Sequence, residues 1–350
     1  MCVPQKDESK YTGLPTVYLD QNILDAFLKG KLCKLEESIT NRYQAVYSNE
    51  TLNEIKRAGE ASSEYSNSFL KILKKINAAH ITIELDSTFY DTDQARISHL
   101  DPFDAYKQYC ESEPVFNNVA EGMRQFGFKM AGGRKGESLE EVSKDSIDAF
   151  SQLMDYMDEQ LKVIEDEAPE LVNMLKMMKG DWLKEFKKSS DLKNNILSEN
   201  IEDEKIWSGI NDFRRAVKIE PYHFNNIRSP NLLQQIWDKI SSSDALSGFN
   251  LSLDEFFMFN HNLLMPDKPF FRHLKIIGAY NILNTIGYYP DKPLHKERGF
   301  KRATSDQTHA SIASFTDCLI TADDRFAKKT TAIYEYLRVK TEVMHFKRIE

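Results

Sequence analysis

Acidic residues stand beside short apolar segments at several separate places in this sequence. Four of these acids could bind a metal ion or take part in catalysis: Asp20, Glu54, Asp306 and Asp323. Carboxylates that crowd together raise one another's pKa unless a cation compensates their charge. Mg²⁺ and Mn²⁺ meet that need, since hard cations take oxygen ligands. The sequence therefore predicts a Mg²⁺ or Mn²⁺ site formed by these four acids.

The elements that must position the acids are strands and helices in alternation. Five segments rich in apolar and β-branched residues read as short strands: 16–20, 44–48, 79–86, 318–321 and 341–346. Between the first three, apolar residues recur at steps of three and four, as on helices packed against a sheet. One of these helices opens on Thr51-Leu52-Asn53-Glu54, the spacing of a capping box, which predicts Glu54 in its first turn. The pattern indicates an α/β fold with a doubly wound parallel sheet of about five strands.

The order of the strands decides whether the acids can meet. If strand 16–20 lies beside strand 318–321, the direction of winding reverses between them. Ligands bind outside the carboxyl ends of the strands at such a switch point. Asp20 and Asp323 then follow neighbouring strands at one edge of the sheet. The other two acids lie near predicted helix starts, which belong to the same edge.

The same geometry discriminates among the remaining acids. Asp317 lies 11 residues beyond Asp306, which is about 16 Å along a helix. It is therefore predicted at the opposite edge, as a cap or turn residue. Asp324 follows Asp323 directly and stays second choice as the last metal ligand.

A long segment interrupts the alternation of strands and helices. We predict an α/β domain over 14–90 and 300–350, with an all-helical insertion over 91–299. Periodic apolar residues predict helices in the insertion at 138–164, 169–187, 202–217, 229–240, 253–264 and 269–287. This insertion is the expected place for a regulatory partner or for contact between copies of the chain.

Composition sets bounds on the class of protein. The formal net charge of -8 argues against a protein that coats nucleic acid by bulk charge, but it permits a local basic patch. The four cysteines are far apart without metal-ligand spacing, and no apolar leader opens the chain, so a cytoplasmic protein with reduced thiols is expected. No apolar segment approaches the roughly 20 residues that cross a bilayer, and no membrane partner is expected.

Other side chains near the acids suggest supporting roles. His309 stands three residues after Asp306, on the same helix face, where it could orient a water or contact a phosphate. Arg298, Lys301 and Arg302 form a basic approach just before Asp306 and are candidates for contact with a phosphate backbone. The chemistry expected of such a centre is metal-assisted hydrolysis of a phosphodiester.

Four pieces of the sequence, taken in order, resemble the PIN-domain ribonucleases. They are Val17-Tyr18-Leu19-Asp20-Gln21-Asn22, Tyr47-Ser48 with Glu54, Asp306 with the helix after it, and Leu319-Ile320-Thr321-Ala322-Asp323. The matched parts make up little more than a third of the chain. The long insertion departs from the compact form of the family.

The resemblance implies a PIN-like sheet and Mg²⁺- or Mn²⁺-dependent cleavage of RNA. It implies that the four acids named above are catalytic and bind the metal. It further implies that Asn22 and Thr321 hydrogen-bond the carboxylates. Many members of the family are toxins, so a toxin or defence role follows as an expectation from the resemblance.

Three functions stay open at this point. The favoured one is an endoribonuclease acting on single-stranded RNA. The second is a PIN-like scaffold that has lost catalysis and binds RNA or another protein through its insertion. The third is a metal-dependent nuclease of DNA, because carboxylate-metal chemistry does not distinguish the sugar.

Overall fold

The computed structural model describes residues 13–60, 62–86, 90–199, 201–224, 226–260, 268–291 and 293–346, without the side chains of 112–120 and 123. These residues form two compact units. The first unit takes its described residues from Met1–Tyr109, Val217–Asp291 and Arg302–Glu350, and the second takes them from Cys110–Ala216 and Lys292–Lys301. Residues 217–291 thus belong with the sheet, although the sequence interpretation assigned them to the insertion.

The first unit is built on one sheet of six strands in the order β4-β3-β2-β1-β5-β6. The strands are β1 (Thr16–Leu19), β2 (Gln44–Tyr47), β3 (Ala79–Leu85), β4 (Asp91–Ser98), β5 (Cys318–Thr321) and β6 (Glu342–His345). All neighbours pair in parallel except β3 and β4. The predicted parallel α/β sheet is confirmed, with β1 between β2 and β5 as the switch point requires.

Strand β4 corrects the prediction of about five strands and of an all-helical segment over 91–299. It pairs with β3 in antiparallel register, with Ile97 opposite Ile81. Its sequence, DTDQARIS, lacks the apolar alternation that identifies strands, because it is an edge strand with several exposed side chains. Backbone hydrogen bonds to β3, rather than an apolar pattern of its own, hold this segment as a strand.

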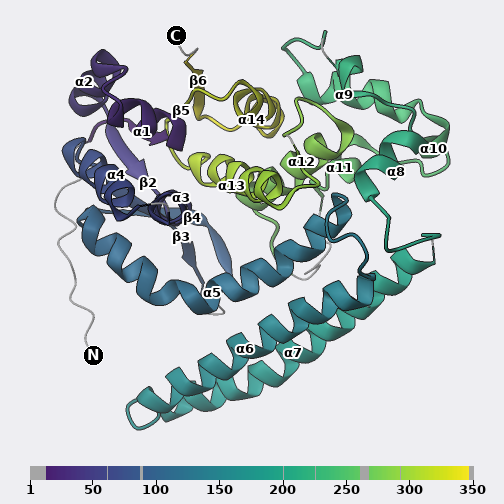
Figure 1. The fold of residues 1–350 in the computed structure, drawn as a ribbon, viewed down its shortest axis with the longest axis horizontal. Coiled ribbons are helices and arrows are strands. Elements are labelled where there is room, and N and C mark those ends of the chain that lie inside the picture. The colour runs from purple at the N-terminus through teal and green to yellow at the C-terminus, as the bar shows by residue number, and fades with distance from the viewer. Residues whose placement is uncertain are drawn as a thin grey trace. The chain divides into compact units, whose positions relative to one another are not determined.

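Successive residues of β1 serve opposite faces of the sheet, as the pleat requires. Val17 and Leu19 belong to a buried core with side chains of α1 (Gln21–Leu28), α3 (Asn49–Gly59) and α4 (Ser63–Lys75). Tyr18, between them, contacts α13 on the other face. The sheet therefore has helices on both faces (Figure 1).

The first unit contains further helices in addition to α1, α3 and α4. They are α2 (Cys33–Arg42), α9 (Leu232–Ser241), α10 (Asp244–Ser247), α11 (Leu253–Phe256), α12 (Arg272–Ile286) and α14 (Asp324–Leu337), with a short 3-10 turn at Pro221–Phe224. α13 (Glu297–Ala313) begins in the second unit and ends in the first. Helix α12 packs on α14. The helix predicted at 253–264 ends at Phe256, and residues 261–267 lie outside the described part.

The second unit contains α5 (Pro102–Met130, which begins in the first unit), α6 (Leu139–Ile164), α7 (Pro169–Ser198) and α8 (Gly209–Ala216). Helices α6 and α7 form a long antiparallel hairpin (Figure 1), joined by stacking of Phe150 on Phe186 with ring centroids 4.5 Å apart. Helix α5 was not predicted. Pro114, Gly122 and Gly127 weaken its helical signal, because proline and glycine are the poorest helix formers.

Two expectations from composition can be compared with the described residues. Cys33, Cys110 and Cys318 are free thiols, while Cys2 lies outside the described part. None of the helices in that part combines the length and the apolar character that a bilayer crossing requires.

Candidate metal centre

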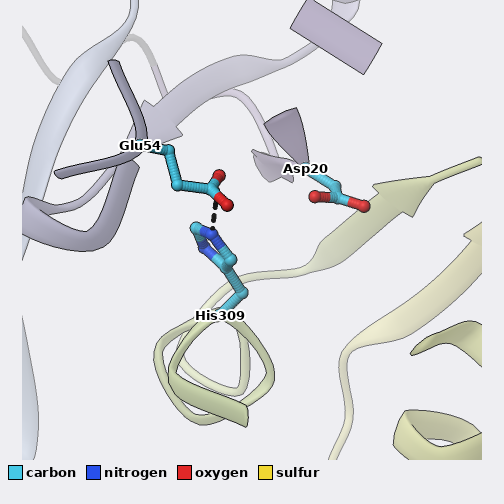
Figure 2. A group of neighbouring side chains, drawn as sticks. All are labelled: Asp20, Glu54 and His309. Carbon is cyan, nitrogen blue, oxygen red and sulfur yellow. Dashed lines mark hydrogen bonds and ion pairs between the residues drawn. The ribbon is translucent and has the colours of Figure 1, made fainter. Parts of the chain in front are cut away.

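Asp20, Glu54 and His309 each bring one potential ligand atom into a single group. The three atoms all lie within 4.8 Å of one another. Figure 2 shows the carboxylate of Asp20 facing the pair formed by Glu54 and His309, with each residue on a different element. Six ligands at about 2.1 Å from one ion lie about 3 Å or about 4.2 Å apart. At most one pair among three ligands can be about 4.2 Å apart, so these side chains would have to move closer together, by up to about 1.8 Å for a pair at the 4.8 Å limit, to bind one cation.

Asp20 is positioned by the pairing of β1 with β5. Its backbone N–H donates to the carbonyl oxygen of Ile320 at 3.0 Å, and its side chain is only 6% exposed. Asn22 Nδ2 and Thr321 Oγ1 both donate to Asp20 Oδ2. Asn22 Oδ1 in turn accepts from the N–H of Ala322 at 2.8 Å. Within the described part of the chain no hydrogen bond occupies Oδ1, which is left for a ligand.

The surroundings of Asp20 disfavour its negative charge. Burial raises its pKa to about 6, opposed by the positive charge of His309 and assisted by Glu54. The hydrogen bond from Thr321 lowers the pKa, and Asp323 raises it. A carboxylate of this kind gains from a cation in contact with it.

Helix α3 positions Glu54, but it does not begin where the sequence predicted. Ser48 is the N-cap: its Oγ accepts from the N–H of Thr51 at 3.4 Å, and Thr51 Oγ1 accepts from the N–H of Ser48 at 3.2 Å. The prediction that Thr51 opens a capping box with Glu54 was wrong, because the helix starts at Asn49. Glu54 therefore lies in the second turn.

Three neighbours hold the Glu54 carboxylate in its charged form. Burial alone would raise the pKa of Glu54, but the charge and hydrogen bond of His309 outweigh it and lower the pKa below its ordinary value. Arg57, at 3.6 Å from Oε1, and Ser305, whose hydroxyl donates to Oε1 at 3.1 Å, act in the same direction. Glu54 is thus ready to bind a cation at neutral pH.

His309 lies at the centre of the group and is 1% exposed. Its Nε2 lies 3.1 Å from Glu54 Oε2, and its Nδ1 lies 2.7 Å from Tyr18 Oη. Burial would lower the pKa of the ring, but Tyr18 and the carboxylates of Glu54 and Glu50 raise it well above the usual histidine value. These contacts favour the charged ring, in which one N–H is directed at Tyr18 and the other at Glu54.

The Tyr18 hydroxyl extends this chain of hydrogen bonds. Tyr18 Oη lies 2.6 Å from Ser48 Oγ, so it can accept from His309 and donate to the cap of α3. A metal ligand of this type usually has a fixed partner on its second nitrogen. The sequence interpretation missed Tyr18, although a hydroxyl on a buried strand requires a hydrogen-bond partner.

Asp306 lies near this group but is not part of it. The prediction that Asp306 stands near a helix start was wrong, because α13 begins at Glu297 and Asp306 lies in its middle. Burial and the charges of Asp291 and Asp20 raise its pKa well above the ordinary value. Its side chain forms no hydrogen bond or ion pair with the described residues.

The two acids after β5 have different surroundings. Asp323 is the N-cap of α14, and its Oδ1 accepts from the N–H groups of Arg325 at 2.8 Å and Phe326 at 3.0 Å. Asp324 is exposed and lies 3.8 Å from the Nδ1 of His345. Neither acid joins the group of three, although Asp323 lies close enough to raise the pKa of Asp20.

Asp317 lies at the opposite edge, as the sequence predicted. Its Oδ2 accepts from the backbone N–H of Thr16 at 2.7 Å and from Thr16 Oγ1 at 2.8 Å. These bonds join the starts of β1 and β5. Asp317 therefore has a structural role in the register of the sheet.

The basic residues before Asp306 lie within α13 and not on a loop. Lys301 pairs with Glu297 at 2.7 Å and lies 3.8 Å from Glu121, so its charge is partly neutralised by protein carboxylates. Arg298 and Arg302 are exposed.

A buried lysine that pairs with Asp291 was also missed. Lys329 is 0% exposed and lies 2.5 Å from Asp291 Oδ2. Its charge acts on Asp306. A signal was present in the sequence: Lys329 stands between Phe326 and Ile333, at the steps of three and four that mark the buried face of the helix.

Comparison with known proteins gives no further guide to this site. No family model, no curated protein and no solved structure matches the chain.

Proposed function

We propose that this chain is a metal-dependent endoribonuclease in which Asp20, Glu54 and His309 bind the catalytic ion. The observation that carries the proposal is the group of two carboxylates and one imidazole at the switch point of a parallel sheet. Ligands bind at such points in doubly wound folds. The ordered resemblance of the surrounding motifs to the PIN-domain ribonucleases supports a PIN-like fold and cleavage of single-stranded RNA.

The donor set favours Mn²⁺ over Mg²⁺. Mg²⁺ is held almost entirely by oxygen, whereas imidazole nitrogen suits transition metals. Two carboxylates and His309 fit Mn²⁺ better than four carboxylates would have done. A bound ion of this kind would polarise a phosphoryl oxygen and lower the pKa of a coordinated water.

The protein contributes position and charge to this reaction. Asn22 and Thr321 hold Asp20 Oδ2, which fixes the direction of Oδ1. Tyr18 holds Nδ1 of His309, which would leave Nε2 as the nitrogen that binds the ion. Because the contact with Glu54 favours a proton on that nitrogen, binding of a cation there would displace the proton.

The outer residues have supporting roles in the proposal. Asp306 and Asp323 would bind the ion through water, with Asp324 as the alternative to Asp323. Arg298 and Arg302 are exposed and can contact a phosphate backbone, while Lys301 is already engaged by carboxylates. A cytoplasmic toxin or defence role, and regulation through the helical segment, rest on the resemblance alone.

One observation favours the scaffold as second candidate. The 3.1 Å contact between His309 and Glu54 satisfies both charges without a metal ion. A protein in which this ion pair is permanent would keep the fold and lose the catalytic centre. Binding of Mn²⁺ therefore separates the two candidates before any activity is measured.

The test is cleavage of labelled single-stranded RNA and DNA in Mn²⁺, Mg²⁺ or EDTA. We expect cleavage of RNA with Mn²⁺, and a loss of more than about 100-fold in Asp20→Asn and His309→Gln, since even residues that support a metal ligand contribute 10–100-fold. Asp25→Asn is the matched control, because Asp25 is a carboxylate on α1 paired with Lys29. Cleavage that persists in both site variants would rule out this centre, and cleavage of DNA alone would assign a deoxyribonuclease.

A further inference from the structure

One face of α3 gathers polar and charged side chains beside the three proposed ligands. Glu50, Asn53, Glu54 and Arg57 are separated by steps of three and four residues, so they share this face of the helix. Ser305 of α13 meets the same face: its Oγ lies 2.6 Å from Glu50 Oε1 and 3.1 Å from Glu54 Oε1. Two carboxylates therefore converge on one hydroxyl, which has a single proton to donate.

Arg57 supplies the positive charge that this pair of carboxylates requires. Its Nη2 lies 3.3 Å from Glu50 Oε1 and 3.6 Å from Glu54 Oε1, and it donates to Ser305 Oγ at 3.2 Å. Asn53 Nδ2 also donates to Glu50 Oε1, at 3.2 Å, and so helps to fix that carboxylate. The guanidinium is thus held in one place before a ligand arrives, which reduces the entropy lost on binding.

Arg57 has further donors that point to a second acceptor. Every side-chain hydrogen bond that it forms with a described residue comes from Nη2, and the side chain is 32% exposed. A guanidinium has five N–H donors, so those on Nε and Nη1 remain for an acceptor from solution. The planar fork of donors matches the oxygens of a phosphate group.

Arg57 and His309 contact different oxygens of the Glu54 carboxylate. His309 Nε2 lies 3.1 Å from Oε2 (Figure 2), whereas Arg57 Nη2 lies 3.6 Å from Oε1. An ion bound to Oε2 at about 2.1 Å would therefore lie within about 8 Å of Nη2. A phosphate group bound to that ion would have the guanidinium as a neighbour.

We propose that Arg57 binds a phosphate group of the nucleic-acid strand at the metal centre. The inference deepens the proposed function and rests on it only in requiring that a single strand binds at this face. Glu50 and Ser305 are positioning residues, because they hold the guanidinium. A phosphate contact carries no sequence information, so RNA and DNA strands of the same sequence should depend on Arg57 equally.

The test is binding of a fluorescently labelled single-stranded RNA to the full chain, measured by anisotropy in EDTA at several KCl concentrations. In Arg57→Gln we expect binding at low salt to weaken by about 10-fold, because hydrogen bonds between charged groups are strong ones. The plot of log affinity against log salt should become shallower by about 0.7, the value for one phosphate contact in a single strand. Arg57→Lys keeps the charge but not the fork, so we expect the wild-type slope with a reduced affinity.

Arg42→Gln is the matched control. Arg42 is an exposed arginine at the end of α2, directly before β2, and so belongs to the edge of the sheet opposite the proposed ligands. The variant loses the same charge as Arg57→Gln. We expect its affinity for RNA and its salt slope to match those of the wild type.

Titration with Mn²⁺ separates a phosphate contact from mere support of Glu54. We expect Arg57→Gln to bind Mn²⁺ at least as tightly as the wild type, because the lost charge is positive. An arginine that only supports Glu54 would instead give a variant with Mn²⁺ affinity lower by about 10-fold or more and an unchanged salt slope for RNA. That result would overturn the phosphate contact.

The remaining outcomes distinguish this inference from the proposed function. An unchanged slope in Arg57→Gln, with cleavage of RNA by the wild type, would overturn the contact and leave the nuclease standing. A shallower slope without any cleavage by the wild type in Mn²⁺ would keep the contact and remove the nuclease. A wild type that binds no RNA in either EDTA or Mn²⁺ would remove both. If Arg57→Gln does not fold, Arg57→Lys decides: reduced affinity for RNA supports the contact, and unchanged affinity overturns it.

Discussion

At the scale of single residues, the centre holds negative charge where the fold disfavours it. Asp20 has a pKa of about 6, so the folded protein binds its proton more tightly than the unfolded chain does. Between the unfolded value near 4 and about 6, the folded state therefore carries more protons, and stability falls as pH rises through this window. Above it, the charged Asp20 opposes folding of the protein without a cation.

Because the charged Asp20 destabilises the folded protein above this pH window, replacing Asp20 with a neutral residue should stabilise the protein. Asp20→Asn can still accept from Asn22 and Thr321 but never becomes charged. We expect its unfolding free energy in EDTA at pH 8 to exceed that of the wild type by about 2–3 kcal/mol, since each pKa unit corresponds to 1.36 kcal/mol. Urea unfolding at pH 8 and near pH 4 measures this difference, which should nearly vanish at the lower pH.

Mn²⁺ supplies the control for Asp20→Asn. Excess Mn²⁺ should raise the melting temperature of the wild type, because a ligand of the native state stabilises it by mass action. The melting temperature of Asp20→Asn should rise only slightly with Mn²⁺. A variant that is less stable than the wild type at pH 8 in EDTA would contradict the assignment of an unfavourable charge to Asp20.

Sequence reasoning found part of this site and missed another part for physical reasons. Asp20 and Thr321 could be placed, because acids and hydroxyls at the ends of short buried strands have few alternative positions. The buried ion pair of Lys329 with Asp291 could not, since it depends on the packing of α12 against α14, which are distant in the chain. His309 was expected only to support the acids, because sequence spacing gave no distance to Glu54.

At the scale of elements, the start of α3 links the fold to the site. Ser48 caps the helix that carries Glu54 and also contacts the hydroxyl of Tyr18. Tyr18 in turn holds the ring of His309. One side chain thus positions two of the three ligands.

Ser48→Ala tests this link. We expect a loss of about 1 kcal/mol in unfolding free energy, typical for the removal of an N-cap. We also expect Mn²⁺ affinity to fall by about 10-fold or more, the range for residues that support a metal ligand. Titration calorimetry with Mn²⁺ and urea unfolding measure the two effects.

Ser138→Ala is the matched control. Ser138 forms a capping box with Glu141 at the start of α6, in the second unit. It should reduce stability without changing Mn²⁺ affinity. Equal affinities in the two variants would separate Ser48 from the metal centre.

The prediction of elements succeeded where local pattern determines structure. The strands of the parallel sheet are short apolar segments and could be recognised. β4 depends on the hydrogen bonds of β3, and the start of α13 lies in a basic segment that contains Gly299, so neither has a strong local signal. The position of Asp306 was predicted from a helix start that does not exist at that point.

At the scale of the whole molecule, the three ligands all belong to the first unit. The second unit has its own packing in the α6–α7 hairpin, which closes on itself: Ser143 Oγ donates to Asn194 Oδ1 at 2.9 Å. The N–H of Gly136 also donates to the carbonyl oxygen of Lys205 at 2.9 Å. The two ends of the hairpin therefore lie close together.

A shortened chain tests the independence of the centre. Residues 146–191 can be replaced by a short glycine-serine linker, because flexible linkers of this kind span such a gap. We expect Mn²⁺ affinity within about threefold of the wild type, since no ligand is removed; calorimetry measures it, and circular dichroism confirms folding. Loss of Mn²⁺ binding by a folded protein would show that the hairpin contributes to the centre.

The pairing of β1 with β5 has a consequence for the order in which the protein is made. His309 follows Glu54 by 255 residues, and domains fold as the chain emerges at about 5–20 residues per second. For many seconds the growing chain carries two of the three ligands and a β1 edge without its neighbour. A ribosome that stops before α13 would release a product without His309, the third proposed ligand. The proposed metal centre is complete only after α13 has been made.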